Sequence, residues 1–309
     1  MQNAVTAILG IKYPLVQAPM AWVTDAKLVA AVSKAGGLGV LGTHAGQTVE
    51  NAAPDFLATQ LQQQIQAVQA ETVAPFAVNI EAPRPEERVA DHPVTAALLP
   101  VAFAAEVPVF AIVGTPHAEL FDLIKAHGGK IIFRPMTPDV AQMQLAEKLG
   151  ADILVATGSD EGGLLPEQDY GTFTVVPAMV DAVSIPVLAA GGINDRRGVQ
   201  AAYALGAAGV YVGTRFLATK EAPMAVTAKD RLIASTYQDL VAVSPVQRSI
   251  ATVAAKALVH NDHPLPNAYS LLPAMRLGAV EDGVITVNTG IDVIRDIPSV
   301  ADLIQRLMN

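Results

Sequence analysis

Short apolar runs recur along the whole chain, each no longer than eight residues and almost free of charge. Uninterrupted runs of this length are typical of strands that are buried on both faces, as in a parallel sheet. The pattern therefore predicts strands at residues 15–20, 38–43, 76–80, 107–114, 130–136, 152–158, 185–192 and 209–216.

Segments with helical spacing lie between these runs. Helices are predicted over residues 25–35, 138–149 and 195–205, and a glycine that suits a C-cap follows each of them. Eight strands that alternate with helices predict an α/β fold, a (β/α)8 TIM barrel. A doubly wound open sheet is the alternative, and the number of strands favours the closed barrel.

The alternation stops after the eighth run. Residues 217–297 are expected to form a small helical and irregular addition near the mouth of the barrel, and SVADLIQRLMN closes the chain as a helix. The predicted barrel therefore comprises residues 1–216 and 298–309.

Composition restricts the partners. The chain has 309 residues, and 29 acidic side chains exceed 20 Lys and Arg, which gives a net charge of −9. This balance provides no basic face for nucleic acid. A phosphorylated cofactor is still allowed, because backbone N–H groups can hold one phosphate. The expected partner is a small-molecule substrate. The chain could also form a homodimer, which the composition does not decide.

Cysteine is absent, which excludes disulfides, thiolate nucleophiles and cysteine-based metal sites. No run is long enough to span a membrane, and the first residues do not resemble a signal peptide. We therefore expect a cytoplasmic protein without a membrane partner. The six histidines show no metal-ligand spacing, and most are expected at the surface.

Two glycine-containing segments end adjacent predicted strands. They are AAGGI at 189–193 and YVGTRF at 211–216, the ends of strands seven and eight, where barrels commonly dock a phosphate group. Gly191 and Gly192 would let the backbone approach an anion closely, and Gly213 and Thr214 would add N–H donors and a hydroxyl. In contrast, GLGVLG at 37–42 follows a helix and opens a strand, which is the wrong order for a dinucleotide fingerprint.

Two further strand ends suit a flat cofactor. Pro19 and Met20, in QAPM at the end of the first strand, would form an apolar surface under an aromatic ring, although core filling explains them nearly as well. Asn79 ends the third strand inside an apolar run, and its buried amide needs hydrogen-bond partners. A cofactor ring edge or the neighbouring backbone could supply them.

Taken together, QAPM, AVNI, GSDEGG, IPVLAAGGI and GVYVGTRF resemble the nitronate monooxygenase (2-nitropropane dioxygenase) family, which includes FMN-dependent enoyl-acyl-carrier-protein reductases. The closing segment, EDGVITVNTGIDVIRDIPSVADLIQRL, is similar to that of the family. The resemblance implies a barrel that holds FMN at its mouth. It implies flavin contacts at Asn79 and Gly162, and phosphate contacts at Gly191, Gly192, Tyr211, Val212, Gly213 and Thr214.

The loop after the sixth strand departs from the family pattern. The family sequence there reads glutamine, glycine, any residue, glutamate, alanine, two glycines and histidine. In this chain Thr157 replaces the glutamine, Asp160 and Glu161 replace glutamate and alanine, and Leu164 replaces the histidine. The resemblance implies that this histidine removes a proton from the nitroalkane carbon, which leucine cannot do.

The catalytic residues are therefore unknown from the sequence. Glu161 is one candidate base, although adjacent Asp160 and Glu161 are more simply explained as a solvated pair at a loop tip. His44 and His117 follow strands two and four, and are the other candidates.

Three functional hypotheses follow. The leading one is an FMN-dependent oxidoreductase that oxidises nitronates, or passes electrons from NAD(P)H through FMN to oxygen or an organic acceptor. The first alternative is an NAD(P)H-dependent enoyl-thioester reductase. The second is a flavin- or phosphate-ligand-binding barrel without turnover, which the loss of the histidine keeps open. Fold alone does not decide among them.

Overall fold

Eight parallel strands form the centre of the molecule. A computed structural model describes residues 3–259 and 271–309. In the sheet each strand pairs with its neighbours in chain order, from β2 round to β8, and β8 pairs with β1. The strands are β1 (Leu15–Gln17), β2 (Gly39–Leu41), β3 (Phe76–Glu81), β4 (Val109–Val113), β5 (Lys130–Arg134), β6 (Ile153–Thr157), β7 (Val187–Ala190) and β8 (Gly209–Val212).

The ring closes between β1 and β2. Val16 and Leu38 form a parallel bridge, and the backbone N–H of Gln17 donates to the carbonyl of Leu38 at 2.9 Å. The fold is therefore a (β/α)8 barrel, as predicted, and the doubly wound alternative is wrong. Seven of the eight observed strands are shorter than the predicted runs, because the last residues of most runs turn into loops at the mouth, whereas β3 extends to Glu81.

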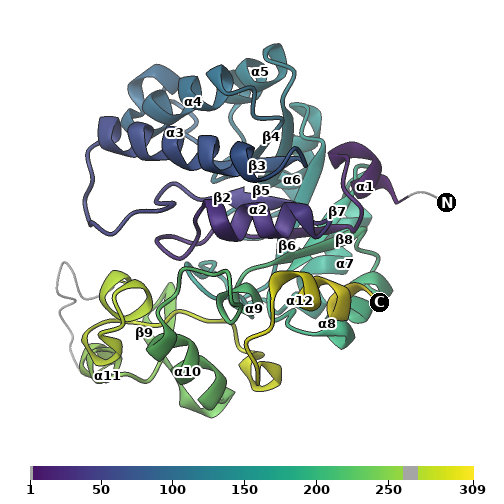
Figure 1. Ribbon diagram of the computed structural model, residues 1–309. Helices are drawn as coiled ribbons and strands as arrows, with labels where there is room; N and C mark the ends of the chain where they lie inside the picture. Colours follow the sequence, from purple (N-terminus) through teal and green to yellow (C-terminus); the bar gives the residue numbers. More distant parts are fainter. Residues whose placement is uncertain (1–2, 260–270) are drawn as a thin grey trace.

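Helices surround the barrel (Figure 1). The three helices expected from the sequence are present as α2, α6 and α8, and the closing helix is α12. The helices are α1 (Ala4–Leu9), α2 (Ala26–Lys34), α3 (Pro54–Glu71), α4 (Pro93–Ala104), α5 (Ala118–Ala126), α6 (Val140–Lys148), α7 (Thr172–Ala182), α8 (Arg196–Ala204), α9 (Thr214–Leu217), α10 (Val226–Ala234), α11 (Val253–Val259) and α12 (Val300–Met308). The helix α12 packs against both α2 and α8, and so joins the first and last helices of the outer ring.

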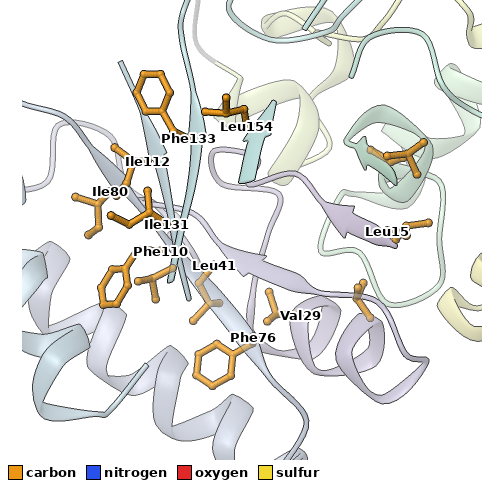
Figure 2. Packing of buried hydrophobic residues seen from close by; sticks show 14 of the residues in the cluster. Leu15, Val29, Leu41, Phe76, Ile80, Phe110, Ile112, Ile131, Phe133 and Leu154 are labelled. Atoms are coloured by element: carbon orange, nitrogen blue, oxygen red, sulfur yellow. The ribbon is translucent and has the colours of Figure 1, made fainter. Parts of the chain in front are cut away.

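Alternation along the strands separates two apolar layers. In β4, Phe110 and Ile112 face the helices, whereas Val109 and Ala111 face the barrel axis. Figure 2 shows part of the outer layer, to which Phe110, Ile112, Ile131 and Phe133 belong. Val5 and Leu9 of α1 join the inner layer, which gives the interior a packed base.

The segment after β8 contains a feature that the sequence did not predict. Besides α10, α11 and the short helices Tyr237–Asp239, Leu272–Arg276, Val280–Asp282 and Ile291–Val293, it contains an antiparallel pair, β9 (Leu240–Ser244) and β10 (Gln247–Ile250). QRSI in β10 is mostly polar and gives no strand signal, whereas LVAVS in β9 is an apolar run whose pairing partner the sequence does not reveal. In Figure 1, β9, α10 and α11 lie together at one end of the barrel.

No helix among the described residues is long and apolar enough to cross a membrane. Within the same part of the chain, no cluster of His, Cys, Asp or Glu is suited to hold a metal ion.

Candidate functional site

A cavity of about 630 Å³ opens at the carboxyl-terminal ends of the strands. Each of the eight strands contributes to its lining, either directly or through the loop that follows it. Space exists there because inward-facing side chains near the mouth, such as Ala111 and Ala190, are small. Gln247, Met275 and Asn288 line it from the segment after β8, so this segment lies at the mouth as expected.

The cavity brings together all nine residues that the sequence assigned to cofactor binding. They are Met20, Asn79, Gly162, Gly191, Gly192, Tyr211, Val212, Gly213 and Thr214. Residues separated by nearly 200 positions in the sequence thus line the same cavity. Their role in binding a cofactor stays a prediction.

The ends of β7 and β8 present free backbone donors. Gly191 and Gly192 have φ angles of +104° and +73°, which side-chain-bearing residues rarely adopt. Within residues 3–259 and 271–309, no protein acceptor receives a hydrogen bond from the N–H of Gly192, Gly213 or Thr214. Three N–H groups at adjacent strand ends are a donor set that suits a phosphate, so these residues fit the phosphate of FMN.

Residues 287–290 of the segment after β8, called the strap here, lie against the ends of β7 and β8. The N–H of Asn288 donates to Thr214 Oγ1 at 3.0 Å, which leaves the Thr214 hydroxyl hydrogen for another acceptor. Asn288 and Asn194 also exchange two side-chain hydrogen bonds of 2.8 Å each. The strap therefore fixes the strand ends from above, and sequence reasoning did not identify it.

Met20 and Asn79 lie on other walls of the cavity. A Cβ placed on Gly213 would lie 3.8 Å from Met20 Sδ, so the end of β1 lies directly beside the end of β8. Asn79 Nδ2 donates to the carbonyl of Ala111 at 2.8 Å. The neighbouring backbone thus satisfies the amide nitrogen, and no described donor occupies Asn79 Oδ1, which suits it to accept from a ring edge.

The loop after β6 contributes to a partly buried ion pair. Nη2 of Arg134, the last residue of β5, lies 2.5 and 2.6 Å from the two carboxylate oxygens of Glu161. Their side chains are only 15% and 13% exposed. Burial raises the pKa of Glu161 to about 7 against the opposing charge of Arg134. Burial also raises the pKa of Tyr211, which faces the same cavity, well above its usual range.

The prediction of a solvated acidic pair is wrong. Asp160 accepts hydrogen bonds from the N–H of Thr172 at 2.7 Å and from Thr289 Oγ1 at 3.1 Å. Glu161 is only 13% exposed and is paired with Arg134. The loop is covered by the segment after β8, which the local sequence does not reveal.

Gly162 and Leu164 show how this loop packs. A Cβ on Gly162 would lie 2.6 Å from the carbonyl carbon of Val287, so the backbone of the strap touches the loop directly. Leu164 is half exposed, lines the cavity and forms an antiparallel bridge with Gln247 of β10. Position 164 therefore does face the cavity, and an apolar side chain occupies it.

The two candidate histidines have different placements. His44 lines the cavity and stacks on Trp22 with ring centroids 4.5 Å apart, and burial lowers its pKa. His117, the other candidate base, does not line the cavity. Its Nδ1 caps α5 by accepting from the N–H of Leu120, and its Nε2 lies 2.8 Å from the carbonyl of Glu87. His117 is therefore a buried residue with a structural role.

His260 and His263 lie outside the described residues.

Arg134 is the main site residue that sequence reasoning missed. A signal was present, because Arg134 is the charged residue at the carboxyl end of the apolar run KIIFRPM, where barrels place functional groups. The structure shows that it lines the cavity.

The fold and the cavity define a (β/α)8 barrel with its candidate site at the carboxyl ends of the strands. The chain belongs to the nitronate monooxygenase family, whose sequence model matches residues 2–309. A probable nitronate monooxygenase of Staphylococcus aureus (strain Newman) is 33% identical over 276 residues, 78% of this chain and 74% of that protein. Members of this family are flavin-dependent oxidoreductases.

A second relative has a different named activity. The (3aS,4S,5R,7aS)-5-hydroxy-7a-methyl-1-oxo-octahydro-1H-indene-4-carboxyl-CoA dehydrogenase of Rhodococcus jostii (strain RHA1) is 36% identical over 242 residues, 77% of this chain. The match spans 62% of the length of that relative.

Two solved structures are similar over nearly the whole chain. FabK from Thermotoga maritima has a TM-score of 0.85 and 30% identity, and the match covers 99% of this chain and 95% of FabK. A nitroalkane oxidase from Streptomyces ansochromogenes has a TM-score of 0.78 and 25% identity, and the match covers 98% of this chain and 96% of the oxidase.

Proposed function

We propose that the cavity binds FMN, with the phosphate at the ends of β7 and β8. The support is the set of unpartnered N–H groups at Gly192, Gly213 and Thr214, together with the free hydroxyl hydrogen of Thr214. Met20 would lie against the flat ring, and Asn79 Oδ1 would accept a hydrogen bond from its edge. Bound FMN would supply two-electron redox chemistry, while the chain positions it and excludes water.

We further propose that the protein is an FMN-dependent oxidoreductase that oxidises a substrate already in its anionic form, such as a nitronate. The observation that carries this proposal is Leu164, which lines the cavity where the family resemblance implies a histidine base. Leucine accepts no proton, and both oxygens of Glu161 are held by Arg134. A nitronate needs no base, because its carbon has already lost the proton.

Steady-state oxygen consumption tests this proposal. Propane-2-nitronate and neutral 2-nitropropane would be compared with purified protein of known flavin content. The absence of a general base typically costs about 10²–10⁴-fold, so the nitronate should be oxidised faster by a factor in this range. Equal rates on the two forms would show that another base operates, and His44 would be the first residue to replace.

An NAD(P)H-dependent enoyl-thioester reductase is the second candidate. Two observations favour it: the similarity to FabK, an enoyl-acyl-carrier-protein reductase, over 99% of the chain, and the relative that is named for a CoA thioester. The net charge of −9 disfavours an acidic carrier protein as partner, so a CoA thioester is the better test substrate. Anaerobic bleaching of the flavin by NADH or NADPH, followed by reoxidation with crotonyl-CoA, would favour the reductase over the nitronate oxidase.

A further inference from the structure

Arg134 is held in one orientation by two residues of the loop after β6. Its Nε donates to Thr157 Oγ1 at 3.1 Å, and its Nη2 contacts both carboxylate oxygens of Glu161. These are two of the positions at which the loop departs from the family pattern. Both replacements supply an oxygen acceptor to the same guanidinium, so the departures have one structural consequence: a fixed arginine in the cavity wall.

One arm of this guanidinium has no hydrogen-bond partner among residues 3–259 and 271–309. Arginine carries five N–H donors, and the contacts to Thr157 and Glu161 account for those on Nε and Nη2. Among the residues that the structure describes, none accepts a hydrogen bond from Nη1 of Arg134. Since the side chain lines the cavity and is only 15% exposed, its two remaining donors are available to an acceptor within that space.

We propose that Nη1 of Arg134 is the group that binds the charged oxygen of the substrate anion. Glu161 and Thr157 are positioning residues, which hold the guanidinium so that Nη1 is left for the ligand. The ligand class is a small anion, such as a nitronate or a carboxylate, because the two N–H groups of Nη1 can form charge-assisted hydrogen bonds with a charged oxygen. This inference rests on the proposed oxidation of an anionic substrate, and adds the residue that selects for its charge.

Glu161 makes the affinity depend on pH. The other charged or titratable groups near Arg134 are Tyr211 and Arg248, and His44 and Glu81 line the cavity farther round. Arg248 donates to the carbonyls of Ser159 and Glu161, so it is engaged by the backbone. Protonation of Glu161 removes the nearest negative charge from Arg134. Anion affinity should therefore rise as the pH falls from about 8 to about 6, through the pKa of Glu161 of about 7.

Isothermal titration calorimetry with isobutyrate tests the inference on the purified full-length protein. Isobutyramide, which has a similar shape and no charge, is the matched ligand. The wild type should bind isobutyrate and discriminate against the amide. The double substitution Arg134→Gln with Glu161→Gln removes both charges together, and should weaken isobutyrate binding roughly 10- to 100-fold, the value of a charged hydrogen bond.

Glu161→Gln alone should change binding in the opposite direction. It leaves Arg134 charged and removes its competing carboxylate, so isobutyrate should bind several-fold more tightly and with little dependence on pH. Arg88→Gln is the control for net charge, because Arg88 is 71% exposed and does not line the cavity. It should bind isobutyrate like the wild type.

Several results would overturn the inference: no isobutyrate binding by the wild type, equal binding of isobutyrate and isobutyramide, or wild-type affinity in the double variant. If the double variant does not fold, Glu161→Gln decides, and unchanged affinity in that variant refutes the inference. The flavin content of each preparation, read from its absorbance, is a separate result. Protein without flavin contradicts the proposed cofactor, whereas flavin-loaded protein whose anion binding ignores Arg134 contradicts only this inference.

Discussion

Replacement of Gly213 by aspartate should remove FMN from the protein. A Cβ on Gly213 would lie 3.6 Å from Ala18 Cβ and 3.8 Å from Met20 Sδ, which are ordinary contacts, so the fold should accept a side chain there. The added carboxylate would lie in the proposed phosphate site. Two unit charges about 4 Å apart at an effective dielectric constant of about 20 repel each other by about 4 kcal/mol. This energy corresponds to a roughly thousandfold weaker affinity for FMN.

The assay is titration of flavin-free protein with FMN, in which binding is measured by the quenching of flavin fluorescence. Gly213→Ala is the matched control, because it adds the same Cβ without the charge, and its dissociation constant should stay within about tenfold of the wild type. Thermal unfolding of the flavin-free forms shows whether all three proteins fold equally well. If Gly213→Asp folds and binds FMN as tightly as Gly213→Ala, the phosphate does not lie at the end of β8.

Three further predictions concern the loop after β6. Leu164→His should raise the rate on neutral 2-nitropropane at least several-fold and leave the rate on propane-2-nitronate nearly unchanged, since it supplies a base; no gain in flavin-loaded protein would indicate a remodelled loop. Because burial raises the pKa of Glu161 from 4.5 to about 7, the folded state retains a proton that the unfolded state releases. The unfolding free energy of the wild type relative to Glu161→Gln should therefore fall by up to about 3 kcal/mol as the pH rises from 4.5 to about 7. Urea titrations at several pH values measure this difference, and a difference that does not change with pH would refute the prediction. Gly162→Ala should lower the unfolding free energy by about 1–3 kcal/mol, because its Cβ would lie 2.6 Å from the Val287 carbonyl carbon. Gly171→Ala, whose nearest contact would be 3.4 Å, is its control, and equal stability of the two variants would argue against this packing.

The barrel could be predicted because its strands carry their own signal. Each is an uninterrupted apolar run between helices with recognisable caps, as for α2, which begins at the Asp25 cap. The pairing of β9 with β10 carried no such signal, because QRSI in β10 contains no apolar run, although LVAVS in β9 does. Val241 and Val243 of β9 pack with Ala255 and Val284, a small cluster formed by distant segments.

The cavity wall at the ends of β7 and β8 could also be predicted, because glycines at adjacent strand ends are visible locally. The charged part of the site could not, since its partners are distant in the sequence. Arg134 lies 23 residues from Thr157 and 27 residues from Glu161. The burial of Asp160 and Glu161 depends on Thr289 and the rest of the strap, more than a hundred residues later. A local pattern of two acidic residues in a glycine loop does not contain that information.

The most direct test of the proposed function is an anaerobic single turnover of the flavin-loaded protein. Propane-2-nitronate and 2-nitropropane, each in excess, would be mixed separately with the protein while the flavin absorbance is recorded. The account predicts rapid bleaching by the nitronate and bleaching by the neutral nitroalkane that is slower by about 10²–10⁴-fold. A flavin that neither form bleaches, but that NADH or NADPH reduces, would contradict the account and favour the thioester reductase.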